Sequence, residues 1–293
     1  MESRLSTAQA QTARFPASIV ADLFAWLFLG ATGLLVIVPL VFMVTSSFMP
    51  ALEIMRMPYR WIPIPFRPEN YVTAIAGNDG SFIYLRNILN SLIVSGSIMV
   101  TTVLLSSLVG YGLAKFRFRG RTLVFMLIMA TMMIPFETIM VPLYLVTLKL
   151  GMQDSYRGLI IPFMMNAFGV FLMRQYLLTF PEDMLDAARI DGAGEIRIFR
   201  GIVFPNCAPA IASLAILTFR QQWDNLLWPL LVAQRESMKT IPAYIVKFAA
   251  EKHADEGAMM AVAVIASLPV FALFFTLSNY FVGGSAVYSA GKE

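Results

Sequence analysis

The chain has 293 residues, of which 58% are hydrophobic and only 14% are Asp, Glu, Lys or Arg. A soluble domain carries charge on roughly a quarter of its residues, so this chain could not cover a water-exposed surface. The 23 Phe and 10 Tyr exclude an intrinsically disordered chain, and a single cysteine, Cys207, excludes an internally disulfide-bonded scaffold. Its modest net charge of +4, without a clustered basic patch, does not indicate a nucleic-acid partner. The class that remains compatible with this composition is an integral membrane protein.

Six apolar runs predict an all-α, polytopic membrane protein with six transmembrane helices. A helix needs about 20 apolar residues to cross the hydrocarbon core, and an even number of spans places both termini on one side of the membrane. We expect an amino-terminal tail over residues 1–22, a transmembrane domain over 23–282 and a carboxy-terminal tail over 283–293. The runs cover residues 23–44, 91–114, 123–148, 159–178, 208–233 and 258–282.

The runs differ in regularity. The second is rich in Gly, Ser and Thr, which predicts close packing inside a bundle because small side chains let helix backbones approach in lipid. The third carries Pro135, Glu137 and Pro142, and the fourth carries Pro162 and Asn166, so both are expected to be less regular.

The short turn after the second run indicates the orientation. It holds Lys115, Arg117, Arg119 and Arg121 within seven residues. Basic residues concentrate in short cytosolic loops. We therefore expect this turn, and with it both termini, to face the cytosol.

Residues 179–206, between the fourth and fifth runs, predict a short helix, a glycine turn and a second helix. Pro181 suits the first turn of a helix, and Gly192 is placed to end that helix in a left-handed conformation. The second helix is expected to begin at Glu195 and to stop at Pro205. Such an amphipathic element between two spans is typical of a docking site for a soluble partner.

The run Asp186-Ala-Ala-Arg-Ile-Asp-Gly-Ala193, followed by Phe199, Ile202, Pro205 and Pro209, resembles the EAA loop of permease subunits of bacterial ABC importers. The Ile-Asp-Gly-Ala form is similar to the carbohydrate-uptake branch, with a maltose-type permease fold. The similarity extends over nearly the whole chain. One departure is Asp186, where the family has Glu; it keeps the charge but has a shorter reach.

The resemblance implies a heterodimer with a second permease subunit, a dimer of ATP-binding subunits that bind ATP and Mg, and an extracytoplasmic solute-binding protein. It further implies a multi-pass protein of the bacterial inner membrane that imports a sugar, an oligosaccharide or a related polyol by alternating access. The loop would be cytosolic, and its ATPase-coupling residues would be Asp186, Ala187, Ala188, Asp191, Gly192 and Pro205.

Other functions are disfavoured by the residues themselves. No GxxxxGK[ST] run is present, so ATP hydrolysis is expected in a separate subunit and the chain is not expected to be an enzyme or to hold a cofactor. An ion-coupled secondary transporter is the alternative, but inverted repeats are not evident. An intramembrane protease is a remote alternative, since His253 is the only histidine and lies in a polar loop. One Cys and one His cannot form a tetrahedral metal site.

The polar hexad from Arg220 to Asn225, within the fifth run, admits two interpretations. It could line a passage for a polyhydroxylated solute, with Trp223 and Trp228 stacking on sugar faces. Alternatively, Arg220 and Asp224 could neutralise each other one helical turn apart. Glu137, between two prolines, could shape a broken helix or join a gate. The candidate translocation residues are Glu137, Arg220, Trp223, Asp224 and Asn225.

Overall fold

A computed structural model describes residues 16–77, 80–250 and 255–289, and within these ranges the chain is helical and contains no strand. The all-α fold class is thereby confirmed. The helices are α1 (Pro16–Ser46), α2 (Ala51–Ile54), α3 (Glu69–Ala76), α4 (Ile83–Lys115), α5 (Arg121–Thr131), α6 (Phe136–Lys149), α7 (Tyr156–Ile160), η1 (Ile161–Phe163), α8 (Ala167–Leu178), α9 (Glu182–Ile190), α10 (Glu195–Ile198), η2 (Phe199–Val203), α11 (Phe204–Asn206), α12 (Ala208–Trp223), α13 (Leu227–Val232), η3 (Glu236–Met238), α14 (Ile241–Ala250) and α15 (Glu256–Ser289).

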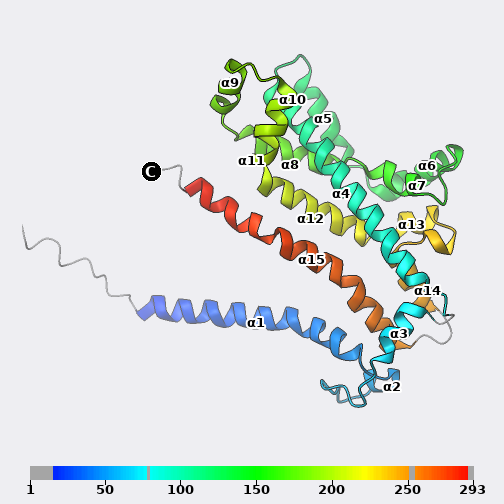
Figure 1. Ribbon diagram of the computed structural model, residues 1–293. Helices are drawn as coiled ribbons and strands as arrows, with labels where there is room; N and C mark the ends of the chain where they lie inside the picture. The colour runs from blue at the N-terminus through cyan, green and yellow to red at the C-terminus, as the bar shows by residue number, and fades with distance from the viewer. Residues whose placement is uncertain (1–15, 78–79, 251–254, 290–293) are drawn as a thin grey trace, which may run out of the picture.

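Three helices of the described chain are long and apolar enough to cross a membrane unbroken, namely Ala21–Ser46, Ile83–Lys115 and Glu256–Ser278. Three further pairs qualify if each bent pair counts as one span, which gives up to six. The start of α1, the end of α15 and α9 lie toward one side of the molecule, and α2, α3 and α14 lie toward the other (Figure 1).

Helix α4 forms the centre of the bundle, as its small residues predict. It packs along α8 and α12. Ser95, Ser106, Ser107 and Gly110 of this helix are buried, and Ser106 and Gly110 lie against α8. A Cβ atom placed on Gly110 would lie 2.9 Å from Met173 Cβ and 3.0 Å from the Arg174 nitrogen. Glycine therefore sets the α4–α8 separation.

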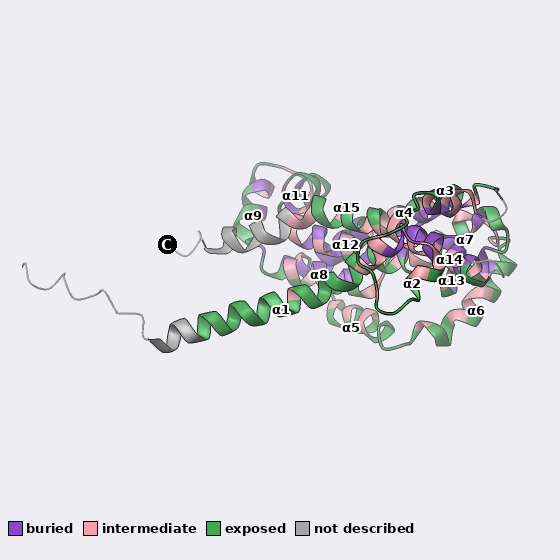
Figure 2. Cartoon of the chain, turned by 90° about the horizontal axis from the view of Figure 1, so that it is seen from below, coloured by how far each residue is buried: buried purple, intermediate pink, exposed green. Residues whose placement is uncertain are grey.

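Helix α1 stands apart from this bundle. Its side chains are exposed along most of its length (Figure 2), and it meets the rest of the chain where its carboxy-terminal end contacts α15. That junction is held by Asn70 of α3, whose Nδ2 donates to the carbonyls of Ser47 (3.0 Å) and Met49 (2.8 Å). Gly257 packs against the same amide, because a Cβ at this position would collide with Asn70 Nδ2.

The third and fourth runs are bent, as their prolines and Asn166 suggest. Helices α5 and α6 meet at 94° across residues 132–135, and Pro135 caps α6. The fourth run bends by 42° between η1 and α8, where Asn166 Oδ1 accepts a hydrogen bond from the Gly169 nitrogen at 2.6 Å. Each bend frees backbone groups that a continuous helix would have used.

Several boundaries differ from the sequence-based expectation. Helix α1 begins at Pro16, inside the tail expected over 1–22, and α4 begins at Ile83, eight residues before the expected run of 91–114. The fifth run is not one helix over 208–233, because α12 ends at Trp223 and a separate α13 begins at Leu227. At this break, Asn225 Oδ1 accepts a hydrogen bond from the Trp228 nitrogen at 3.4 Å. At the carboxy-terminal end, α15 continues to Ser289, past the expected boundary at 282.

Candidate coupling helix and candidate solute passage

Helix α9 presents an acidic outer face and an apolar inner face. Asp186, Ala187 and Asp191 are exposed, whereas Leu185 and Ala188 are buried in the core cluster formed with α8, α10 and α12. The i, i+3 spacing of Leu185 and Ala188 places them on one side of the helix. Ala188, which we expected on the coupling surface, thus supports the helix from beneath.

The turn that ends α9 needs a glycine. Gly192 has φ +80°, a left-handed conformation that only glycine adopts at no cost. The Gly192 nitrogen donates to the Arg189 carbonyl (3.0 Å), and the Ala193 nitrogen donates to the Ala188 carbonyl (3.0 Å). These bonds satisfy the last carbonyls of the helix and confirm the predicted glycine stop.

An ion-paired bracket connects α9 to α10 and to the end of α4. Arg189 Nε donates to Glu195 Oε1 at 2.8 Å, and Arg189 Nη1 donates to Asp186 Oδ1 at 2.8 Å. Tyr111 of α4 donates from its hydroxyl to the other oxygen, Glu195 Oε2, at 2.7 Å. The Arg189 hydrogen bond lowers the pKa of the Glu195 carboxyl, with a smaller contribution from Tyr111, so the bracket keeps its negative charge.

A second bond fixes the start of α9 to α4. Lys115 Nζ donates to the Phe180 carbonyl at 2.7 Å and to Glu182 Oε1 at 3.0 Å, and the lysine side chain is 2% exposed. Helix α9 is therefore attached to α4 directly at its start and, through Glu195 of α10, at its end.

Beyond the glycine turn, the second helix runs further than predicted. It begins at Glu195 as expected, widens into a π-helical turn, η2, and continues through α11 to Asn206. Pro205 lies inside α11 and is exposed, and the 77° bend into α12 falls at Cys207. A proline in the first turn of a helical segment loses no hydrogen bond, which explains why the helix continues past Pro205 to Asn206.

Several of the candidate translocation residues share a cavity. Its volume is about 410 Å³, and it lies between the start of α6 and the break that follows α12. The structure brings Glu137 of α6 together with Asp224 and Asn225, and with Gln221 and Gln222 of the same polar hexad. Phe136 and Phe163 close the apolar side.

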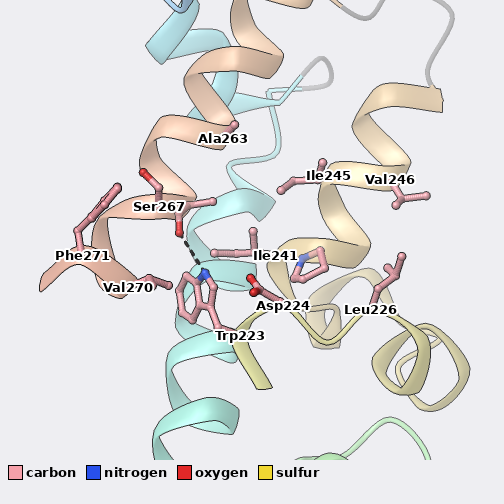
Figure 3. Close-up of a pocket in the computed structure, with 12 residues that line it drawn as sticks. Trp223, Asp224, Leu226, Ile241, Ile245, Val246, Ala263, Ser267, Val270 and Phe271 are labelled. Carbon is pink, nitrogen blue, oxygen red and sulfur yellow. Dashed lines mark hydrogen bonds between the residues drawn. The ribbon is translucent and has the colours of Figure 1, made fainter. Parts of the chain in front are cut away.

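The remaining candidates lie elsewhere. Arg220 Nε and Asp224 Oδ2 are 3.6 Å apart with both side chains more than half exposed, which is the four-residue pair that one interpretation predicted. Such an exposed pair contributes little stability. Trp223 is buried, stacks on Phe219 with centroids 5.4 Å apart and donates from Nε1 to the Ala266 carbonyl at 3.0 Å (Figure 3).

Trp223, inside the hexad, and Trp228, three residues after it, both pack into the protein interior. Trp223 edges a mainly apolar groove of about 540 Å³ between α14 and α15, and Asp224 is the only carboxylate among its described lining residues (Figure 3). Trp228 is 1% exposed, donates from Nε1 to the Gly158 carbonyl at 3.0 Å and packs against Phe136 and Phe163. The expectation that Trp228 is available to stack on a sugar is wrong, because its ring is already enclosed.

The comparisons with known proteins agree with this architecture. Residues 102–284 match the family described as "Binding-protein-dependent transport system inner membrane component". The chain is 35% identical over 263 residues to the arabinooligosaccharides transport system permease protein AraQ of Bacillus subtilis, covering 89% of this chain and 92% of that protein. It is 33% identical over 270 residues to the sn-glycerol-3-phosphate transport system permease protein UgpE of Rhizobium meliloti, covering 90% and 96%.

A solved structure shares the fold. A chain from a bacterial ABC transporter involved in the import of the acidic polysaccharide alginate superposes with a TM-score of 0.80, covering 91% of this chain and 98% of that one at 21% identity. The family match spans more than half of the sequence, and the relatives are aligned almost from end to end. The chain belongs to the family of binding-protein-dependent transport system inner membrane components and is a permease subunit of an ABC importer.

Proposed function

We propose that this permease imports a neutral, polyhydroxylated solute and that an ATP-binding subunit drives it by seating against α9. The exposed outer face of α9, held rigidly on α4, carries this proposal. Exposed apolar side chains that an isolated soluble protein would bury mark a surface on which a partner docks. Ile190 and Ile196, on either side of the Gly192 turn, are 87% and 85% exposed beside Asp186 and Asp191.

The bonds between α9 and α4 supply the mechanical link. A push on α9 reaches α4 through Glu195 to Tyr111 and through Glu182 to Lys115. Because α4 packs along both α8 and α12, its displacement would move the walls of the bundle. Alternating access would follow as the two ATP-binding subunits close and separate with ATP and Mg bound between them, and a second permease subunit would form the other half of the passage.

The cavity beside Glu137 suggests the solute class. Its wall offers amide and carboxylate groups that match hydroxyls, with phenyl rings on the opposite side. Asp224 is paired with Arg220, whereas Glu137 has no ion-pair partner within the described residues, so its carboxylate would repel a phosphorylated solute. The arabinooligosaccharide relative supports a neutral sugar, and a solute-binding protein would deliver it on the side of α2 and α3.

Thiol labelling tests the docking and the orientation together. In a Cys207→Ser background, Ala187→Cys is expected to react with a membrane-impermeant maleimide only in inverted vesicles and to cross-link to the ATP-binding subunit. Leu52→Cys of α2, 87% exposed at the opposite side of the molecule, is the matched control and is expected to react in intact cells. Labelling of Ala187→Cys from outside intact cells would overturn the proposal.

Uptake by the reconstituted complex tests the solute class separately. With its own binding protein, the complex is expected to accumulate a labelled neutral oligosaccharide at the expense of ATP, and not glycerol phosphate. The reverse preference would contradict the neutral class while leaving the coupling helix untouched. Uptake that persists under an ion gradient after ATP depletion would instead favour a secondary transporter.

A further inference from the structure

The turn between α4 and α5 holds arginines that the coupling bracket does not use. Lys115 is neutralised by Glu182, but Arg117, Arg119 and Arg121 have no acidic partner within the described chain. Arg117 and Arg119 are exposed, and Arg121 Nη1 donates only to the Phe116 carbonyl, at 3.3 Å. The turn therefore presents three uncompensated positive charges.

A fourth arginine approaches the same turn from α8. Arg174 Nε donates to the Leu113 carbonyl at 3.4 Å, and its guanidinium lies 4.0 Å from the centroid of the Phe125 ring. Arg174 thus adds a fourth cation beside the turn, and a bound anion would offset this concentration of positive charge.

The turn also encloses a hollow of the size of a small anionic group. A pocket of about 280 Å³ is lined by Arg117, Phe118, Gly120, Arg121 and Thr122. Two guanidinium groups and a hydroxyl form a donor set suited to phosphate oxygens, which arginine can bind through paired hydrogen bonds.

Exposed apolar side chains adjoin the pocket and identify the source of the phosphate. Phe118 is 47% exposed, and on the first turns of α5 Leu123, Met126 and Leu127 are each more than half exposed. In a membrane protein, these side chains face acyl chains. The arginines then stand at the level of the lipid head groups, where basic residues attract anionic lipid.

We propose that residues 116–122, together with Arg174, bind the phosphate of an anionic phospholipid whose acyl chains lie along α5. A free phosphate would gain nothing from the apolar side chains, and an acidic protein surface would leave them exposed. The site is separate from the solute cavity and from the exposed face of α9.

Native mass spectrometry of the whole importer in detergent measures this directly, with phosphatidylglycerol as the probe and phosphatidylcholine as the reference lipid. The double variant Arg117→Gln/Arg121→Gln is expected to lose roughly tenfold or more in phosphatidylglycerol affinity, because each arginine near an anionic surface adds to binding. The matched control, Arg60→Gln/Arg67→Gln, removes two exposed arginines from the opposite loops and is expected to retain wild-type binding.

Further measurements decide between the sources of phosphate. Arg117→Lys/Arg121→Lys keeps the charge, so it is expected to retain most of the binding and serves if the Gln variant fails to assemble. Equal loss in the control pair, or equal binding of phosphatidylcholine, would overturn the proposal. Binding of inorganic phosphate to the lipid-free complex as tightly as phosphatidylglycerol would assign the pocket to a soluble ion. If the Arg117→Gln/Arg121→Gln variant loses the ATP-binding subunit but still binds phosphatidylglycerol as the wild type does, the arginines contact a protein partner instead of a lipid, and the proposal is overturned.

Discussion

Single polar side chains hold together segments that are far apart in the sequence. Asn70 fastens the end of α1 to α3, and Asn90 donates to the carbonyls of Ser237 and Lys239 at 2.9 Å each, which holds the η3 loop against α4. Such buried amides are costly to leave without partners. Each is therefore a point where one substitution should loosen a whole junction.

Asn70→Ala tests the first junction. It removes two hydrogen bonds and leaves the carbonyls of Ser47 and Met49 without their amide donor. We expect a loss of about 1–3 kcal/mol in stability, measured as a lower midpoint of thermal unfolding in detergent. Asn206→Ala, an exposed asparagine bonded to the Ile202 carbonyl, is the control and should shift the midpoint little. Equal shifts for the two variants would contradict the assignment.

The ion-paired bracket that joins α9, α10 and α4 depends on Glu195. Glu195→Ala removes the contacts to Arg189 and Tyr111 together, whereas Tyr111→Phe removes one. Hydrogen bonds to charged groups contribute about 1.5–3 kcal/mol, so we expect the alanine variant to import several-fold less solute per ATP hydrolysed and Tyr111→Phe to lose less. Glu69→Ala, an exposed glutamate of α3, is the control. An unchanged ratio of uptake to hydrolysis would show that the bracket transmits nothing.

The sequence located the short helix α9 and its glycine turn but not the ion-paired bracket that holds them. The Asp186–Gly192 run and the Gly192 turn are local patterns, and local patterns are readable from spacing alone. Tyr111 and Glu195 are 84 positions apart, and no periodicity relates them. Their contact exists because the fold brings the end of α4 and α10 into one core cluster, which only the folded chain specifies.

At the scale of elements, helix packing in this bundle is controlled by glycine and small residues on α4. Gly110 and Gly112 are two positions apart and differ fully in surroundings: a Cβ on Gly110 would collide with Met173, whereas nothing lies within 4 Å of one on Gly112. The two glycines therefore form a natural pair of test and control on a single helix.

Gly110→Ala is expected to destabilise the bundle by about 1–3 kcal/mol, since the α4–α8 interface has no space for an added methyl group. Gly112→Ala should be neutral or stabilising by up to about 1 kcal/mol, because alanine favours the helix. Unfolding of both variants in denaturing detergent, followed by circular dichroism, measures the difference. Destabilisation by Gly112→Ala of the same size would contradict this account of the interface.

The positions of the bends could be only partly predicted. Pro135 marks the corner between α5 and α6, yet Pro39, Pro142 and Pro269 lie inside α1, α6 and α15 without ending them. A proline in a packed helix can be accommodated when neighbours satisfy the freed carbonyl. Whether a proline breaks a helix therefore depends on the helices packed around it. An apolar run in the sequence does not show which helices those are.

At the scale of the whole molecule, three of the four tryptophans distinguish covered from uncovered helix surfaces. Trp26 of α1 is 74% exposed, whereas Trp223 and Trp228 are 4% and 1% exposed. A single chain that leaves so much of α1 uncovered must place it against acyl chains or against another subunit.

Reconstitution of the isolated permease in brominated lipid distinguishes the buried from the exposed rings. Bromine quenches only tryptophans within contact distance, so Trp26→Phe is expected to remove a large part of the quenching and Trp223→Phe to remove almost none. Assembly with the second permease should relieve the quenching of Trp26 if that subunit covers α1. Strong quenching that depends on Trp223 would contradict the packing of α12 against α15.

The widened turn over Phe199–Val203 has a consequence for how α9 is aimed. A π-helical turn contains one residue more than an α-helical turn, and it is less tightly wound. Deleting Gly201 would restore ordinary winding, and each residue of an α-helix accounts for about 100° of rotation. The acidic face of α9 would then point in a different direction relative to α12. The extra residue of the π-helical turn therefore sets the direction in which that face is exposed.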